Sequence, residues 1–412
     1  MKILMANKFH YNRGGAETYV FNLSDLLEKE GHEVIPFSMD DNQNMSSPYS
    51  EYFVKNIDYV DSLDKFSITT GARVALRSVY SREAKRNIER LIKDTKPDIA
   101  HLNNIHYHLT PSIIRALKKH NVPIIWTLHD YTLICPNTHF LNNGEVCERC
   151  KRYKYFNAPL TKCKKGSFSA SFLACVDSYI HRLMSTYAFV DKFISPSKFL
   201  KDKMVEYGVD EKRITHIPNF INTEKIKEIK KEGTVEDNHS FVFFGRLSAE
   251  KGVDTLVQAV SKLKGAQLLI AGEGPAEKDL QNLSHSLNGS RIDFLGHLKT
   301  EEVSALLNKA SFVVMPSRWY ENFPYSILEA FSFGKPVIGA RIGGIPEQID
   351  DGVDGLLFEP GNKDDLRNKI NRLIDNPSLV TEMGKKAKQK IFKKYDPKTH
   401  YDELIKIYRQ VS

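Results

Sequence analysis

Residues 317–336, SRWYENFPYSILEAFSFGKP, indicate how this chain folds. They follow an apolar run, residues 312–315, that is typical of a buried strand. Pro324 suits the first turn of a helix, because the amide that proline lacks would have no partner there. Helix-forming residues then continue to Gly334 and Pro336, two residue types that end helices. The stretch therefore predicts a strand, a loop and a short helix whose N-terminus lies at the carboxyl edge of a sheet.

Two carboxylates frame this predicted turn. Glu321 lies just before the helix and Glu329 lies eight positions further on, about two helical turns away. Helix N-termini present free amides and partial positive charge, which attract phosphate groups. The stretch therefore predicts amides for a diphosphate and two acceptors for sugar hydroxyls at one site. An ordinary strand–helix unit with a solvated glutamate is the alternative.

Strands and helices alternate along most of the chain, which indicates a parallel, doubly wound α/β sheet. The expected strands are residues 2–8, 33–39, 98–103, 123–128, 192–195, 241–244, 267–271, 291–295, 312–315 and 336–340. The expected helices of the first half are residues 14–31, 82–96, 111–120 and 169–188.

The length and charge distribution divide the chain into two parts. A chain of 412 residues favours two domains. The net charge is +8, of which +7 falls in residues 1–218, with 31 Lys and Arg against 24 Asp and Glu. That excess suits an anionic partner or a membrane surface on the first half, or simply keeps the chain soluble. The charged segment 223–239 is expected to be a linker or a solvated helix.

The first residues of the sequence and the lengths of its apolar runs favour a soluble cytoplasmic protein that could rest on a membrane. The first ten residues, MKILMANKFH, read as a strand rather than as a secretory signal. We find no run of the roughly 20 apolar residues that a bilayer-spanning helix needs.

Several expected strands end in glycine or in a charged side chain, at the edge where doubly wound sheets bind ligands. Gly14 and Gly15 open the first helix, although a bare Gly-Gly is also typical of a tight turn. His129 closes another strand, where it would either face a ligand or be structural. Arg246 and Lys251 flank a strand-to-helix turn, a suitable place for cations that neutralise a diphosphate.

A polar insertion at residues 135–165 is rich in cysteine. Cys135, Cys147, Cys150 and Cys163 are spaced C-x11-C-x2-C-x12-C. Four thiols with a C-x2-C pair are typical of a structural zinc site. A metal would supply folding energy to a segment that we expect to lack a core of its own. An iron–sulfur centre and free thiols are the alternatives, and Cys175 in the next expected helix reads as a buried thiol.

The same region carries many cations, with aromatic side chains between them. We interpret it as a surface that contacts an acceptor or a membrane. Nucleic acid is the rival partner, but we find no recognisable nucleic-acid-binding motif beside it. The basic residues are Arg149, Lys151, Arg152, Lys154, Lys162, Lys164 and Lys165.

Taken together, these motifs resemble the retaining glycosyltransferases of family 4, and the likeness covers nearly the whole chain. The cysteine insertion departs from the common pattern of that family. The motifs that carry the resemblance are GGAE at 14–17, HD at 129–130, SPS at 195–197, IPN at 217–219, FFGRLSAEKG at 243–252, AGEGP at 271–275, FLGH at 294–297, ENFPYSILEA at 321–330 and GGIPEQI at 343–349.

The resemblance implies the GT-B fold, in which two Rossmann-like domains face each other across a cleft. It implies an acceptor domain at residues 1–218 and a nucleotide-sugar donor domain at residues 219–395. The C-terminal helix, residues 396–412, would cross back onto the first domain.

The resemblance also implies roles for individual residues. Arg246 and Lys251 would hold the donor diphosphate, Glu321 would act on the donor sugar, and Glu329 would bind the ribose. His129 would contact the sugar from the first domain. The further donor-binding positions are Gly15 near the diphosphate, His297 and Leu298 at the base, and the amides of Asn322 and Phe323 at the sugar.

The implied activity is transfer of a hexosyl-type sugar, with retention at the anomeric carbon, from a nucleotide sugar that is expected to be UDP-linked. The acceptor would be a saccharide or a lipid-linked molecule of cell-surface polysaccharide or glycoconjugate synthesis. No catalytic metal and no nucleic-acid partner are expected. A nucleotide-sugar epimerase of the same architecture and a non-catalytic binding subunit are the alternatives.

Overall fold

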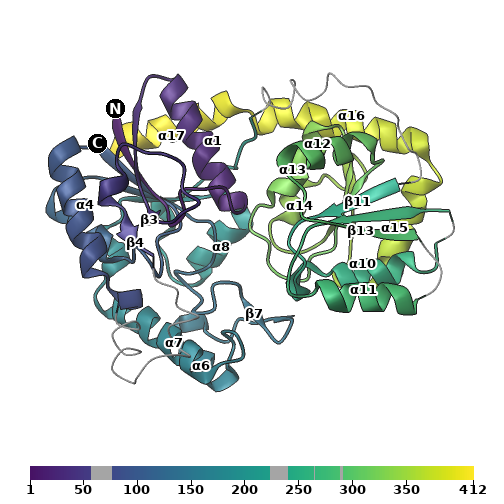
Figure 1. Cartoon of the computed structure of the whole chain (residues 1–412), viewed down its shortest axis with the longest axis horizontal. Coiled ribbons are helices and arrows are strands. Elements are labelled where there is room, and N and C mark those ends of the chain that lie inside the picture. The colour runs from purple at the N-terminus through teal and green to yellow at the C-terminus, as the bar shows by residue number, and fades with distance from the viewer. Residues whose placement is uncertain (57–76, 223–239, 264, 288–290) are drawn as a thin grey trace. The chain divides into compact units, whose positions relative to one another are not determined.

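The computed structural model describes residues 1–56, 77–222, 240–263, 265–287 and 291–412. The charged segment 223–239, expected to be a linker or helix, lies outside them. The chain divides into two units (Figure 1). Unit 1 comprises Met1–His139, Glu148–Pro218 and His400–Ser412, and unit 2 comprises Phe140–Cys147 and Asn219–Thr399.

Unit 1 is built on a six-stranded parallel sheet in the order β10-β9-β6-β5-β1-β2. Its central strands are buried along their whole length, as expected when helices cover both faces of a parallel sheet. The strands are β1 (Lys2–Ala6), β2 (Glu33–Phe37), β5 (Ile99–Leu102), β6 (Ile124–Thr127), β9 (Lys192–Ser195) and β10 (Ile214–His216).

The helices of unit 1 begin where the sequence supplies capping residues. Ser81, Ser167 and Ser197 each accept a backbone amide hydrogen bond at the start of a helix. The helices are α1 (Gly15–Lys29), α4 (Arg82–Thr95), α5 (Ser112–Lys119), α6 (Asn157–Thr161), α7 (Phe168–Leu183) and α8 (Lys198–Glu206), with most of α17 (Pro397–Val411).

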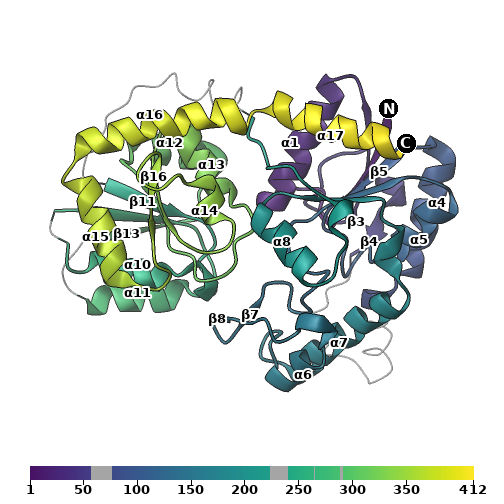
Figure 2. The same ribbon diagram turned by 180° about the vertical axis from the view of Figure 1, so that it is seen from behind.

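The last helix is anchored in unit 1 by two buried polar side chains. The Nε2 atom of His400 lies 3.2 Å from the hydroxyl of Tyr19. The hydroxyl of Tyr408 lies 2.5 Å from Nδ1 of His101, a fully buried side chain on β5. Residues 400–412 therefore belong to unit 1 although they end the chain, as Figure 2 also shows.

Unit 2 repeats this architecture with a second six-stranded parallel sheet, in the order β13-β12-β11-β14-β15-β16. Its strands are β11 (Ser240–Phe244), β12 (Gln267–Ala271), β13 (Arg291–Gly296), β14 (Val313–Met315), β15 (Val337–Ala340) and β16 (Gly355–Phe358). Its helices are α10 (Val253–Val260), α11 (Glu277–Ser286), α12 (Thr300–Lys309), α13 (Tyr325–Ser332), α14 (Ile345–Gln348), α15 (Lys363–Ile374) and α16 (Pro377–Lys394).

The predicted α/β class with two Rossmann-like domains is therefore confirmed, and the differences are local. The first strand ends at Ala6 rather than at Lys8. Pro324 occupies the N-cap of α13 rather than its first turn. The edge strands β10 and β16 were not predicted, because three or four residues beside turns give no clear periodicity.

Among the described residues, no helix is both long enough and apolar enough to cross a membrane.

Candidate functional site

The candidate site of unit 2 lies at the point where the strand order of its sheet reverses. The chain runs outward from β11 to β12 and β13 on one side, and continues through β14 to β16 on the other. Ligands of doubly wound sheets bind beyond the carboxyl ends of the strands at such a switch point. The loops after the neighbouring strands β11 and β14 carry Arg246 and Glu321, so the fold brings these two predicted loops together.

The loops that follow β11 and β12 touch each other through their backbones. Gly272 has φ of +139°, and a Cβ atom there would lie 1.9 Å from the carbonyl oxygen of Gly245. A Cβ atom at Gly274 would lie 2.1 Å from the carbonyl oxygen of Leu247. This packing requires glycine at positions 272 and 274. The side chain of Arg246, in the loop after β11, is exposed. Among the described residues, Arg246 has no hydrogen-bond or ion-pair partner.

Lys251 and Glu321 form an ion pair at the centre of the site. The Nζ atom of Lys251 lies 2.7 Å from Oε1 of Glu321, and the same oxygen accepts a 2.7 Å hydrogen bond from Ser317. Burial favours a raised pKa for Glu321, but the charge of Lys251 and these hydrogen bonds lower it overall. Glu321 is therefore ionised at neutral pH. Lys251 has three donors and uses one here, so it can also bind an anion.

The loop that bears Glu321 rests on a glycine pair that follows β15. A Cβ atom at Gly343 would lie 2.4 Å from the carbonyl oxygen of Glu321. The amide of Gly344 donates a 2.7 Å hydrogen bond to the same oxygen. Sequence analysis assigned no role to these two glycines. Their signal was a Gly-Gly pair separated by two residues from a buried strand.

Glu329 lies on α13 in a much less polar environment than Glu321. Its side chain is partly buried, and burial raises its pKa to about 7. Near neutral pH it therefore exists both as an acid and as a carboxylate. The pKa of Glu321 is thus lowered while the pKa of Glu329 is raised.

Of the other predicted donor-binding residues of unit 2, two lie between these glutamates in the sequence, at 322 and 323, and two follow β13, at 297 and 298. Phe323 is buried and its ring packs against Tyr395 at 5.7 Å, so only its backbone can reach a ligand. Asn322 and Leu298 are partly buried. His297 is exposed, and its amide donates a 3.3 Å hydrogen bond to the carboxylate of Glu273.

In unit 1, Gly15 opens α1 beside two cations that sequence analysis missed. The helix begins without a side-chain cap, which leaves its first amides available. Lys8 and Arg13 each lie 4.5 Å from the ring centroid of Phe9. Burial, with the nearby charge of Arg13, lowers the pKa of Lys8 to about 8. The available signal was a pair of cations in the loop that precedes Gly-Gly.

His129 closes β6, as predicted, and is held by neighbours within unit 1. Its Nε2 atom lies 2.9 Å from Oδ1 of Asn103, and its ring centroid lies 5.2 Å from that of Tyr19. Burial lowers the pKa of His129 to about 4, so the ring is neutral at physiological pH. Because Oδ1 of Asn103 can only accept a hydrogen bond, the single N–H of the neutral ring lies on Nε2 and donates to Asn103, and Nδ1 can accept a hydrogen bond from a ligand hydroxyl.

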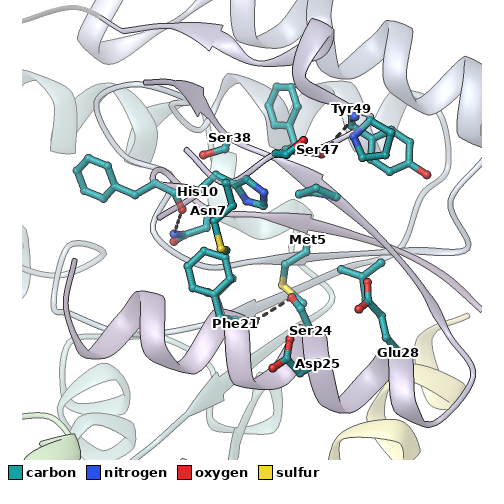
Figure 3. A pocket seen from close by; sticks show the side chains of 18 of the residues that line it. Met5, Asn7, His10, Phe21, Ser24, Asp25, Glu28, Ser38, Ser47 and Tyr49 are labelled. Atoms are coloured by element: carbon teal, nitrogen blue, oxygen red, sulfur yellow. Dashed lines mark hydrogen bonds between the residues drawn. The ribbon is translucent and has the colours of Figure 1, made fainter. Parts of the chain in front are cut away.

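Unit 1 also contains a pocket of about 480 Å³ between α1 and the loop after β2 (Figure 3). Its lining includes Asp25 and Glu28 from α1, together with the aromatic side chains of His10, Phe21 and Tyr49. Pockets of this size, with apolar walls and a few convergent polar groups, are typical ligand sites. The aromatic rings suit the apolar face of a ligand and the carboxylates suit its hydroxyl groups.

The predicted zinc site requires correction. Among the residues that the structure describes, no three cysteine, histidine or acidic side chains are arranged to hold a metal. None of the five cysteines forms a disulfide in the described residues. Cys150 instead packs with Tyr155 and Cys175 in an apolar cluster, with Cys163 against it. The insertion therefore has a small apolar cluster of its own, which involves α6 and α7.

Comparisons with known proteins agree with this architecture. The sequence profile of the glycosyl transferases group 1 matches residues 224–390, and that of glycosyltransferase family 4 matches residues 13–225. An uncharacterized glycosyltransferase of Methanocaldococcus jannaschii is 26% identical over 416 residues, which cover 100% of this chain and 99% of that protein.

Solved structures of similar fold span the whole chain. Sucrose-phosphate synthase from Thermosynechococcus elongatus superposes with a TM-score of 0.71 at 19% identity, over 99% of this chain and 98% of that one. Anabaena HepE, solved in complex with UDP, superposes with a TM-score of 0.65 at 18% identity, over 100% of both chains. The two profile matches together extend from residue 13 to residue 390, and this chain therefore belongs to glycosyltransferase family 4.

Proposed function

We propose that this chain transfers a hexosyl-type sugar from a UDP-linked donor, with retention at the anomeric carbon. The observation that carries the proposal is the group of cationic and acidic side chains at the switch point of unit 2. Arg246 and Lys251 supply cations, the Lys251–Glu321 pair places an ionised carboxylate, and Glu329 lies on the adjoining helix. Anabaena HepE, solved also with UDP-glucose, supports UDP as the nucleotide.

In the proposed reaction, the bond between the anomeric carbon and the diphosphate oxygen breaks while the acceptor oxygen bonds to the same face of that carbon. The acceptor proton passes to the departing phosphate oxygen. Charge accumulates on the leaving diphosphate, where Arg246 and Lys251 stabilise it. Glu321 stabilises the positive charge that develops on the sugar ring. These steps require no metal ion.

The proposed acceptor is a saccharide or a lipid-linked molecule of cell-surface polysaccharide or glycoconjugate synthesis, bound in residues 1–218. The donor binds in residues 219–395, and residues 396–412 complete the acceptor domain. We also propose that the protein is cytoplasmic. His129 and Gly15 contact the donor from the acceptor domain. Asn322 and Phe323 supply amides to the sugar, and His297 and Leu298 line the base.

Incubation with a labelled nucleotide sugar, with and without a saccharide acceptor, tests the transferase. We expect the label to move to the acceptor, and the anomeric coupling constant of the product by NMR to show retention. A labelled epimer formed without any acceptor would identify an epimerase instead. Binding without turnover under all conditions would identify a non-catalytic subunit.

Gly343 is expected to be essential to the position of Glu321. In Gly343→Ala, the new Cβ atom would collide with the backbone of Glu321, and the backbone at φ of +60° would be strained. Gly352→Ala is the matched control, because Gly352 has φ of +79° but nothing within 4 Å of its Cβ position. Gly352→Ala should lower the free energy of unfolding by about 1–3 kcal/mol, and Gly343→Ala should lower it further because of the collision. Only Gly343→Ala should also lower kcat more than about tenfold, and equal turnover in the two variants would contradict this role.

Donor binding should release a proton from Glu329. Burial holds the pKa of the free site near 7, and a ribose hydroxyl that donates to the carboxylate favours its ionised form. Affinity for UDP should therefore rise with pH up to about 7 and then level off. Calorimetry at pH 7 in two buffers of different ionisation enthalpy measures the released proton.

Glu329→Gln provides the control for this measurement. Any proton that the diphosphate of UDP gains or loses on binding is exchanged in the variant as well as in the wild-type protein. At pH 7 the free carboxyl is about half protonated, so the wild-type protein should release up to about half a proton more than the variant. Equal proton release by the two proteins would show that Glu329 does not bind the nucleotide.

A further inference from the structure

Large apolar side chains are exposed mainly on one part of unit 1. Eleven large hydrophobic side chains of the described residues are exposed, and six of them fall between residues 156 and 184. Helices α6 and α7, which carry most of them, pack side by side (Figures 1 and 2). We call this region the α6–α7 surface. Its apolar members are Phe156, Leu160, Phe168, Phe172, Leu183 and Met184.

Helix α7 is amphipathic, but its larger apolar side chains face outward. Ser171, Ala174, Cys175 and His181 form its buried face. The exposed side chains of residues 168, 172 and 183 follow the spacing of a single helical stripe. The rings of residues 168 and 172 stack on each other with centroids 6.1 Å apart. A solvent-facing stripe of this kind indicates a surface that is covered by a partner.

The charge of the same surface identifies the kind of partner. Residues 149–184 contain eight Lys and Arg against a single acidic residue, Asp177. This segment of net charge +7 accounts for almost all of the +8 of the whole chain. The cations with exposed side chains are Arg149, Arg152, Lys154, Lys162, Lys165 and Arg182.

From this combination we propose that the α6–α7 surface docks on an anionic lipid bilayer. An amphipathic helix with Phe and Leu on one face, among Lys and Arg, lies in the interface of a membrane. Anionic headgroups attract the cations while the apolar side chains enter the acyl boundary. A second copy of this chain would present the same +7 segment and be repelled. The surface contains none of the donor-site residues, so this proposal stands independently of the proposed reaction.

The test is sedimentation of the full-length protein with vesicles of phosphatidylcholine, either alone or mixed with phosphatidylglycerol. We expect binding only to the mixed vesicles, and weaker binding as salt is raised. Lys154→Glu/Lys162→Glu should lower the partition coefficient about tenfold or more. Phe168→Ser/Phe172→Ser should lower it by a similar factor, because the apolar contribution is lost.

Matched controls use the same substitutions elsewhere on the chain. Arg86→Glu/Lys93→Glu makes the same charge change on exposed positions of α4, and Val353→Ser/Phe392→Ser removes two exposed apolar side chains of unit 2. Both controls should bind vesicles within about twofold of the wild-type protein. Circular dichroism and thermal unfolding confirm that each variant is folded.

Three outcomes would overturn the proposal. The first is absence of binding to phosphatidylglycerol vesicles, or binding that the controls weaken as much as the test variants do. The second is a concentration-dependent dimer that the Phe168→Ser/Phe172→Ser variant abolishes, which would make a second copy the partner. The third is binding to an RNA duplex that depends on the lysines but not on the phenylalanines, with no vesicle binding.

Discussion

Arg246→Ala is expected to weaken the binding of UDP at least about tenfold, because a charged hydrogen bond contributes about 1.5–3 kcal/mol. Arg246 is exposed at the carboxyl end of β11 and has no partner among the described residues, so its charge is available to the diphosphate. Lys251→Met should lower affinity by a similar factor. It should also destabilise the fold, because Glu321 loses the cation that keeps it ionised in a buried position. Isothermal titration calorimetry measures both affinities.

Arg341→Ala is the matched control for these two substitutions. Arg341 follows β15 as Arg246 follows β11, but Asp351 and Glu359 neutralise it at 2.9 Å and 3.4 Å. Its removal should leave UDP affinity within about twofold of wild type, as expected for an exposed ion pair. Unchanged affinity in Arg246→Ala and Lys251→Met would remove both residues from the diphosphate site.

Glu321→Gln and Glu329→Gln are expected to impair the enzyme in different ways. Glu321→Gln keeps the size of the side chain but removes the charge that would stabilise the developing oxocarbenium ion. It should lower kcat about a hundredfold or more. It should leave the affinity for UDP unchanged or raise it, because Lys251 is released from its ion pair. Glu329→Gln should mainly weaken UDP itself, because the ribose loses a carboxylate acceptor.

The discriminating measurement is the binding of bare UDP by both variants, beside kcat for the complete donor. If Glu321→Gln loses UDP affinity while Glu329→Gln keeps it, the two assignments are reversed. If neither variant changes binding or turnover, the helix at residues 325–332 has no part in catalysis.

Most secondary structure could be predicted because strand and helix signals in this chain are local. Buried strands read as short apolar runs, and three of the helices begin at serine caps. Ligand binding at the carboxyl ends of the strands could be predicted. The switch point could not be located, because the order of parallel strands depends on crossovers between distant segments. The prediction of zinc in the insertion is not supported by the described residues, because thiol spacing says nothing about which side chains pack together. In the folded chain, Cys150 joins Cys175, which lies outside the predicted set.

The sequence by itself determined the α/β class, the two-domain organisation and the candidate residues of the donor site. These depend on periodicity and on short motifs at strand ends, which operate over a few residues. Only the tertiary structure paired Lys251 with Glu321, because 70 positions separate them and adjacent strands bring their loops together. The burial that raises the pKa of Glu329 is visible only in the tertiary structure. The same is true of the outward direction of the apolar stripe of α7. Burial depends on which segments cover a side chain, and those segments are remote in sequence.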